Sequence, residues 1–208
     1  MSTFEMIKKT KAAWPHVRDI GEAKKNKLLR AMAEELEAET ETILSCNRED
    51  IADAKPKMSA VMLDRLMLNA ERIHQMAEGI RAIAELEDHT GRILDRTERP
   101  NGMIITKKQV PLGLVAIIYE SRPNVTSDAA ALALKSGNVC ILRGGKEAFR
   151  SANAIVNALK KGIENAGGCP EIINLLQDLK EKLGLTYVFI THDLTSITYL
   201  CDDVLFLY

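Results

Sequence analysis

The alternation of strand-like and helix-like segments between residues 114 and 165 constrains the fold of this chain more than any other feature. Residues 114–119 and 139–142 are continuous apolar runs of strand length, which is typical of strands buried on both faces of a sheet. Pro123 suits a first helical turn, a helix is expected to follow it as far as Gly137, and residues 147–165 have the pattern of a second helix. This order predicts an α/β fold with parallel strands joined by right-handed helical crossovers.

The residues before 91 are expected to be helical. Ser2 and Glu5 have the spacing of a capping box, and Pro15 is expected to end or interrupt the first helix. The apolar residues between 28 and 44 predict one long helix, and a shorter helix is expected to begin at residues 47–50.

A further helix is predicted after Asn69, which is a suitable N-cap. Its apolar side chains recur at spacings of three and four, which places them on one face: Ile73, Met76, Ile80 and Ile83. Such a stripe can be a partner surface, but packing into the core is the expected role. Residues 92–98 and 103–110 then predict a β-hairpin, because Asn101-Gly102 tolerates the positive φ angles of a tight turn.

The balance of charges and the cysteine spacing indicate the class of protein. The chain has 28 Lys and Arg against 29 Asp and Glu, so nothing favours nucleic acid as a partner. No apolar run approaches the roughly 18–20 residues of a membrane span, and a cytoplasmic protein is expected. Four widely spaced cysteines suit free thiols in a reducing compartment rather than a metal site: Cys46, Cys140, Cys169 and Cys201.

The strongest candidate site is the turn at residues 143–146, where a buried strand ends and a helix begins. Gly144 and Gly145 allow a ligand to approach the backbone, and amides at the start of the next helix favour an anion. Arg143 and Lys146 add positive charge, so a nucleotide phosphate or an adenosine ribose is the expected ligand. The alternative is a glycine turn with two solvated cations.

A second candidate site follows the preceding strand and comprises four consecutive residues: Ser121, Arg122, Pro123 and Asn124. An arginine can hold a phosphate or carboxylate with two hydrogen bonds, and an asparagine can donate to a developing oxyanion. The alternative is a helix N-terminus capped by Ser121 or Asn124. Because parallel strands end at the same edge of a sheet, the two sites are expected to lie side by side.

The residues of both sites carry a resemblance to a known family. The string from 110 to 148, with Y-E-S-R-P-N and L-R-G-G-K-E-A within it, resembles gamma-glutamyl phosphate reductases, also called glutamate-5-semialdehyde dehydrogenases. The likeness extends upstream through L-D-R-L at 63–66 and covers residues 1–168. It implies an aldehyde dehydrogenase-like fold and, in proline biosynthesis, NADPH-dependent reduction of the small molecule L-glutamyl 5-phosphate. It also implies that residues 143–146 lie along the adenosine ribose and residues 121–124 toward the nicotinamide and substrate, and a homo-oligomer is compatible with it.

The chain departs from the family pattern near Gly168. The family's chemistry needs a cysteine thiolate that displaces phosphate, and that cysteine belongs to a later domain. None of the four cysteines has the expected context, so no catalytic residue and no metal ligand is assigned, and a truncated reductase is predicted.

Residues 172–208 resemble something else, the ATP-binding subunit of an oligopeptide-type ABC transporter. A helix over 171–183 and strands at 186–190 and 204–207 are expected. His192 matches a γ-phosphate-sensing histidine, but without the other ATPase motifs it is expected to have no such role. The phosphate loop of such ATPases is missing, because Glu147 follows Lys146 where a Ser or Thr is required. The prediction is therefore a joined chain, with a reductase-like region at 1–168 and an ATPase-like fragment at 171–208. An ABC-type ATPase fragment and a non-catalytic interaction module are the alternative functions.

Overall fold

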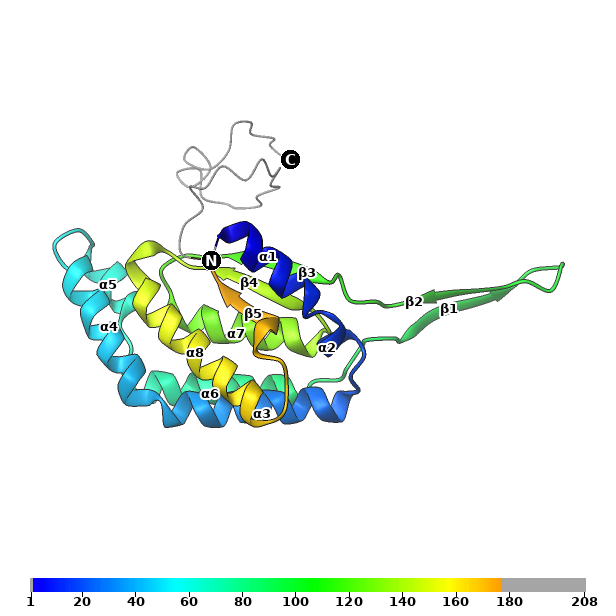
Figure 1. The fold of residues 1–208 in the computed structure, drawn as a ribbon, viewed down its shortest axis with the longest axis horizontal. Coiled ribbons are helices and arrows are strands. Elements are labelled where there is room, and N and C mark those ends of the chain that lie inside the picture. Colours follow the sequence, from blue (N-terminus) through cyan, green and yellow to red (C-terminus); the bar gives the residue numbers. More distant parts are fainter. Residues whose placement is uncertain (1, 177–208) are drawn as a thin grey trace, which may run out of the picture. The chain divides into compact units, whose positions relative to one another are not determined.

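The computed structural model of the chain describes residues 2–176, whose helices and strands are shown in Figure 1. The first half is helical and contains α1 (Thr3–Ala12), α2 (Pro15–Arg18), α3 (Glu22–Ala38), α4 (Thr40–Ala54), α5 (Ala60–Leu66) and α6 (Ala70–Glu85). A hairpin of β1 (Ile93–Glu98) and β2 (Ile104–Lys108) follows. The second half contains β3 (Leu114–Ile118), α7 (Pro123–Lys135), β4 (Val139–Arg143), the 3₁₀ helix η1 (Lys146–Ala148), α8 (Phe149–Asn165), the 3₁₀ helix η2 (Pro170–Ile172) and β5 (Ile173–Leu175).

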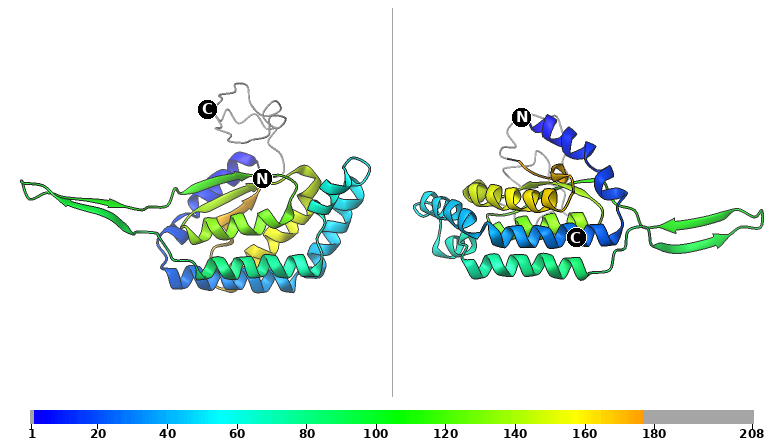
Figure 2. Two further views of the ribbon diagram at one scale, coloured as in Figure 1. Left: turned by 180° about the vertical axis from the view of Figure 1, so that it is seen from behind. Right: turned by 60° about the horizontal axis from the view of Figure 1, so that its bottom comes forward.

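The second half forms the predicted α/β unit with a parallel sheet. Strands β3, β4 and β5 lie in that order, and the register pairs Leu114 with Val139 and Cys140 with Ile173. Helices α7 and α8, which connect the strands, cover one face of the sheet, and α1 lies against β4 and β5 on the other (Figures 1 and 2). Helices α3 and α6 pack on α7 and α8 as an outer layer. The α/β prediction is therefore confirmed.

Two predicted helix starts are present with the expected hydrogen bonds. Ser2 and Glu5 exchange backbone-to-side-chain bonds of 2.8 and 3.2 Å, which completes the capping box of α1. Asn69 Oδ1 accepts from the backbone N–H of Arg72 at 2.7 Å and caps α6. The apolar stripe of α6 packs into the core, with Ile73, Met76 and Ile80 buried and Ile83 half-buried, so the core interpretation is confirmed.

The prediction of one long helix over residues 28–44 is wrong, because α3 ends at Ala38 and α4 begins at Thr40. The Thr40 hydroxyl donates to the carbonyl of Glu37 at 2.7 Å, a local bond that competes with continued helix. The predicted start of a helix at 47–50 is also wrong, since Asn47 and Asp50 are buried inside α4. Asn47 instead bonds Leu66 O and the Ser151 hydroxyl, so its role is to join distant segments.

The hairpin prediction is confirmed. β1 and β2 pair antiparallel and extend away from the helices in all views (Figures 1 and 2). Gly102 takes the positive φ of 80°, while Asn101 keeps a negative φ and accepts a hydrogen bond from the N–H of Met103 at 3.1 Å. The turn therefore needs glycine at one position.

Two further predictions are corrected near the sheet. β3 is not buried on both faces, because α1 covers β4 and β5 and leaves Ile118 of this edge strand 37% exposed. The helix predicted to begin at residue 171 is replaced by η2 and β5, since Ile173 and Leu175 bury their side chains by pairing with β4. The remainder of that predicted helix and the strands at 186–190 and 204–207 lie outside the described residues. Within residues 2–176, no helix is long and apolar enough to cross a membrane.

Candidate functional site

The two predicted sites are brought together at the carboxyl ends of β3 and β4. The backbone N–H of Tyr119 donates to the carbonyl of Arg143 at 3.0 Å, which continues the strand pairing into the loops. The Tyr119 ring lies over Gly144, where an added Cβ would be 3.1 Å from the ring. The Tyr119 hydroxyl shares a 2.7 Å hydrogen bond with Thr126 on α7. Burial raises the pKa of Tyr119, so this phenol stays neutral and acts as a structural link between the loop and the helix.

Gly145 allows close contact between the two loops. The Ser121 hydroxyl donates to Glu147 Oε2 at 2.9 Å and lies where a side chain at 145 would begin, 2.0 Å from an added Cβ. The sequence predicted that Gly144 and Gly145 make room for a ligand. That explanation for the two glycines is wrong, because Tyr119 and Ser121 occupy the space beside them.

The predicted anion site at the start of α8 is already filled by the chain itself. Asp50, which is 2% exposed, accepts from the backbone N–H of Ser151 at 2.8 Å and from its hydroxyl at 2.6 Å. A weaker bond of 3.4 Å comes from the N–H of Arg150. This internal carboxylate satisfies helix amides that the sequence assigned to a nucleotide.

The positive side chains of the turn remain available to an anion. Arg143 donates from Nη1 to the carbonyl of Gly144, but its Nε is buried with no hydrogen-bond partner among the described residues. Lys146 is exposed and lines a hollow of about 700 Å³ that contains a second cation, Lys57, and also carboxylates, two of which pair with Arg150. The turn therefore fits an anionic group through its side-chain cations and not through the amides of α8.

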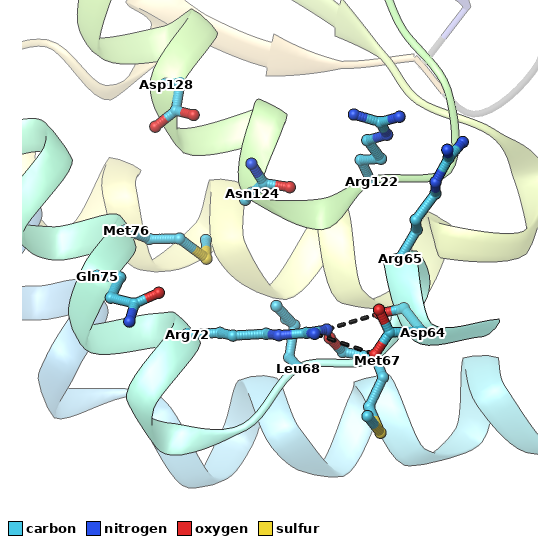
Figure 3. A pocket seen from close by; sticks show the side chains of 10 residues that line it. All are labelled: Asp64, Arg65, Met67, Leu68, Arg72, Gln75, Met76, Arg122, Asn124 and Asp128. Atoms are coloured by element: carbon cyan, nitrogen blue, oxygen red, sulfur yellow. Dashed lines mark hydrogen bonds and ion pairs between the residues drawn. The ribbon is translucent and has the colours of Figure 1, made fainter. Parts of the chain in front are cut away.

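The other predicted residues face a different space. Arg122 and Asn124 line a cavity of about 540 Å³ between the α5–α6 segment and the start of α7, whereas Pro123 is buried in the first turn of α7 (Figure 3). The other residues of the lining are Asp64, Arg65, Met67, Leu68, Arg72, Gln75, Met76 and Asp128.

One arginine of the cavity is fully engaged with the protein. Arg72 donates to the carbonyls of Asp64 and Met67, both at 2.6 Å, and to Asp64 Oδ1 at 3.1 Å (Figure 3). These three bonds close the connection between α5 and α6. Arg72 is therefore part of the cavity's frame.

The other two arginines share one distant carboxylate. Glu120 Oε2 lies 3.5 Å from Arg122 Nε and 3.9 Å from Arg65 Nη1, and its side chain is 66% exposed. Exposed ion pairs at such distances contribute little, and the Arg122 Nε has no hydrogen-bond partner in the described part of the chain. Most donors of both guanidinium groups are free to bind an anion.

Asp128 is the carboxylate that sequence reasoning missed. It is half-buried on α7 and has no hydrogen bond or ion pair with any described residue. Burial raises its pKa above the ordinary value. A sequence signal existed, because Asp128 stands four residues after Asn124 and so shares its helix face. No such signal exists for Asp50, which meets Ser151 across 101 positions.

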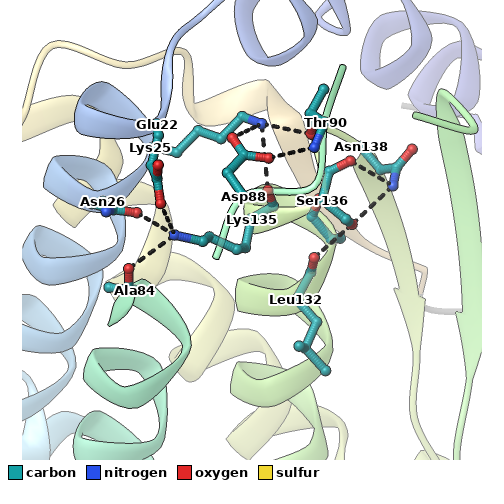
Figure 4. A network of polar contacts seen from close by, with 12 residues as sticks. Glu22, Lys25, Asn26, Ala84, Asp88, Thr90, Leu132, Lys135, Ser136 and Asn138 are labelled. Carbon is teal, nitrogen blue, oxygen red and sulfur yellow. Dashed lines mark hydrogen bonds and ion pairs between the residues drawn. The ribbon is translucent and has the colours of Figure 1, made fainter. Parts of the chain in front are cut away.

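A second polar cluster lies at the other end of α7, and its groups are all paired (Figure 4). Lys25 Nζ donates to Asp88 Oδ2 at 2.8 Å, to Thr90 Oγ1 at 3.0 Å and to the Lys135 carbonyl at 3.4 Å. Lys135 Nζ in turn donates to three acceptors, Asn26 Oδ1 at 2.7 Å, the Ala84 carbonyl at 2.9 Å and Glu22 Oε1 at 3.2 Å. We call this group the lysine cluster. Each ammonium group has a full set of three acceptors, so the cluster joins α3, α6 and α7.

The described cysteines are free thiols, and two of them are poor nucleophiles. Burial raises the pKa of Cys140 to about 12 in β4 and also raises the pKa of Cys46, which lies within α4. Cys169 is half-buried at the start of η2. Cys201 lies outside the described residues.

Comparisons with known proteins show which family this architecture belongs to. The model of the aldehyde dehydrogenase family matches residues 2–193. The chain is 59% identical over 154 residues to the gamma-glutamyl phosphate reductase of Streptococcus suis strain 05ZYH33, covering 74% of this chain and 37% of that protein. It is 50% identical over 182 residues to the reductase of Streptococcus pneumoniae serotype 19F strain G54, covering 88% and 43%. The chain thus spans less than half the length of these curated relatives.

Solved structures show the same fold. The gamma-glutamyl phosphate reductase of Thermotoga maritima matches with a TM-score of 0.82 at 35% identity, over 86% of this chain and 44% of that one. The Saccharomyces cerevisiae reductase matches with a TM-score of 0.77 at 27% identity, over 86% and 47%.

The family match reaches beyond residue 168, where the sequence resemblance ends, and takes in β5. The comparisons give no support to the likeness of residues 172–208 to a transporter ATPase. The division into regions 1–168 and 171–208 stays a prediction, and His192 lies outside the described residues.

Proposed function

The chain belongs to the aldehyde dehydrogenase family, and from this we propose that its described part provides cofactor and substrate binding for the reduction of L-glutamyl 5-phosphate to glutamate 5-semialdehyde. The relatives in two Streptococcus species and in Thermotoga maritima bear the name of the enzyme for this oxidoreduction. The observation that carries the proposal is the contact between the loops after β3 and β4, at the sheet edge where parallel α/β folds bind ligands.

NADP is the proposed cofactor within a family that uses NAD or NADP, and NADPH would supply the hydride when bound. Arg143 and Lys146 would hold its negatively charged groups, and the buried Nε of Arg143 is a donor that awaits an acceptor. The extra phosphate of NADP gives these two cations more charge to bind than NAD does. Ser121, fixed by Glu147, would hold the neighbouring loop of residues 121–124 toward the nicotinamide and the substrate.

The described residues contribute binding rather than a nucleophile. A thiol with a pKa near 12 in a buried strand, as in Cys140, is neither ionised at neutral pH nor accessible. We assign no catalytic residue among residues 2–176, and we propose the reductase-like region as a binding unit.

Fluorescence titration of the full chain with NADPH tests this proposal. We expect saturable binding that weakens about tenfold in Arg143→Gln and in Lys146→Gln, because each loses a charge-assisted hydrogen bond. Lys107→Gln is the matched control, since Lys107 is an exposed cation on the hairpin. NADH should bind more weakly than NADPH. No saturable signal at about millimolar NADPH would contradict the proposal.

The remaining partner assignments are also proposals. We propose a cytoplasmic protein that self-associates through the hairpin, where Ile93 and Leu94 are 56% and 51% exposed. Light scattering over a range of concentrations tests this, and a monomer at every concentration would contradict it.

A further inference from the structure

The cavity of Figure 3 holds charged groups of both signs whose hydrogen-bonding capacity the described residues do not fill. Arg72 and Asp64 pair with each other at 3.1 Å and form part of the frame. What remains is one carboxylate, Asp128, together with two guanidinium groups, Arg65 and Arg122, whose ion pairs within residues 2–176 are with the exposed Glu120 alone. A ligand that carries both a cationic and an anionic group would complement this set.

We propose that this cavity binds the α-amino acid end of the substrate, with Asp128 receiving the ammonium group and Arg122 and Arg65 receiving the α-carboxylate. The inference rests on the proposed function, because the substrate named there carries both groups on one carbon. It assigns Asp128, Arg122 and Arg65 as specificity-determining residues.

The position of Asp128 supports its role as the ammonium acceptor. It lies on α7 one helical turn from Asn124, so both side chains belong to the same wall of the cavity. Its Oδ1 is close to α6 at Gly79, where an added Cβ would be only 3.5 Å away. An unpaired, half-buried carboxylate is unfavourable, as its raised pKa indicates, and a bound ammonium group would remove that cost.

The position of Arg122 relates this cavity to the loop of residues 121–124 that we propose lies toward the nicotinamide and the substrate. Arg122 follows Ser121 directly, and the Cα atoms of consecutive residues are about 3.8 Å apart. Ser121 contacts Glu147 in the loop after β4, whereas Arg122 lines the cavity. The cavity therefore adjoins the loop that contains Ser121.

Three related compounds separate the parts of this recognition. L-Glutamate carries both the ammonium group and the α-carboxylate, glutarate lacks the ammonium group, and 4-aminobutyrate lacks the α-carboxylate. Titration of each into the ¹⁵N-labelled full chain, followed by amide chemical shifts, gives an affinity and a location. We expect L-glutamate to shift amides near Asn124 and Asp128 and to bind about tenfold more tightly than glutarate.

Substitutions of Asp128 and Arg122 test which side chain binds the ammonium group and which binds the α-carboxylate. Asp128→Asn should weaken L-glutamate about tenfold and leave glutarate unchanged, whereas Arg122→Gln should weaken L-glutamate and glutarate and leave 4-aminobutyrate unchanged. Asp95→Asn, the same substitution on the exposed strand β1, is the matched control and should bind like the wild type. Glutarate binding to Asp128→Asn also shows that the variant is folded.

Several outcomes would overturn the inference. These are absence of L-glutamate binding, glutarate binding as tight as that of L-glutamate, and unchanged L-glutamate affinity in Asp128→Asn. If glutarate and L-glutamate bind equally, the cavity is an anion site only. If the chain binds NADPH but does not distinguish L-glutamate from glutarate and 4-aminobutyrate, only this inference is refuted. If it distinguishes these compounds but does not bind NADPH, only the proposed function is refuted.

Discussion

The lysine cluster and the cavity lie at opposite ends of α7 and contain similar kinds of residues, but they differ in how completely those residues are paired (Figures 3 and 4). In the lysine cluster, both ammonium groups have three acceptors each and are almost fully buried. Within the described residues, Asp128 of the cavity has no partner, and the contact of Arg122 with Glu120 is a long one of 3.5 Å.

This difference indicates what each group of residues does. A charged group buried with all its hydrogen bonds satisfied contributes to the native structure, and it has nothing left to offer a ligand. A charged group left unpaired costs stability, so its presence at the rim of a cavity indicates binding. The presence of opposite charges does not by itself distinguish the lysine cluster from the cavity, because both contain cations and carboxylates.

The largest effect is expected for Lys25→Met in the lysine cluster. Burial alone would raise the pKa of Asp88, but hydrogen bonds from Lys25 and Thr90 outweigh it and hold the pKa below its ordinary value. Removing Lys25 leaves the largely buried Asp88 side chain without its cation, and the free energy of unfolding should fall by about 3 kcal/mol. Urea denaturation at neutral pH measures this change.

Lys24→Met is the matched control for that measurement. Lys24 is the adjacent residue on α3 and is exposed, so the same substitution there should change stability by less than about 0.5 kcal/mol. Equal effects at the two positions would refute the assignment of the lysine cluster as a structural unit.

A smaller effect is expected for Asp50→Ala at the start of α8. The Ser151 N–H and hydroxyl would lose their acceptor, and the free energy of unfolding should fall by about 2 kcal/mol. Asp53→Ala is the control, because Asp53 pairs with the same Arg150 from an exposed position and should contribute less than about 0.5 kcal/mol. If Asp50→Ala costs no more than Asp53→Ala in urea denaturation, the amides of α8 do not depend on the internal carboxylate.

Local patterns in the sequence were sufficient to predict the elements of the sheet region. The apolar runs gave β3 and β4, and the spacing on either side gave α7 and α8, because burial on a sheet selects those patterns. The break between α3 and α4 was missed, since the apolar residues Leu36 and Ile43 keep helical spacing across it. β5 was missed because three residues carry too little periodicity to distinguish a strand from the start of a helix.

The candidate site could be predicted only in part. The sequence correctly brought Ser121 and Gly145 together, because parallel strands end at one edge of the sheet. It could not show that Asp50 occupies the start of α8, since that contact joins residues about a hundred positions apart. Nor could it show that Arg122 and Asn124 face a cavity, whose other wall comes from α5 and α6. Pairing across such separations is a tertiary property.

The smallest effect, and the one of opposite sign, is expected for Asp128→Asn. Burial raises the pKa of Asp128, so above that raised pKa the charged form opposes folding. The asparagine variant should therefore be more stable than the wild type at neutral pH, by less than about 1 kcal/mol because the side chain is only half-buried and partly screened by solvent. Urea denaturation as a function of pH measures the difference.

The pH dependence then separates the two ends of α7. The advantage of Asp128→Asn should vanish as the pH falls below about 4, the ordinary value for an aspartic acid, because the wild-type carboxyl is then neutral in both states. The depressed pKa of Asp88 has the opposite consequence, since the stability that Lys25 and Asp88 contribute is present above about 4 and is lost as the pH falls further. The two variants should thus diverge from the wild type in opposite directions at neutral pH and converge on it in acid. Destabilisation by Asp128→Asn at neutral pH would show that this carboxylate has a partner in the protein, and the contrast between cavity and cluster would be lost.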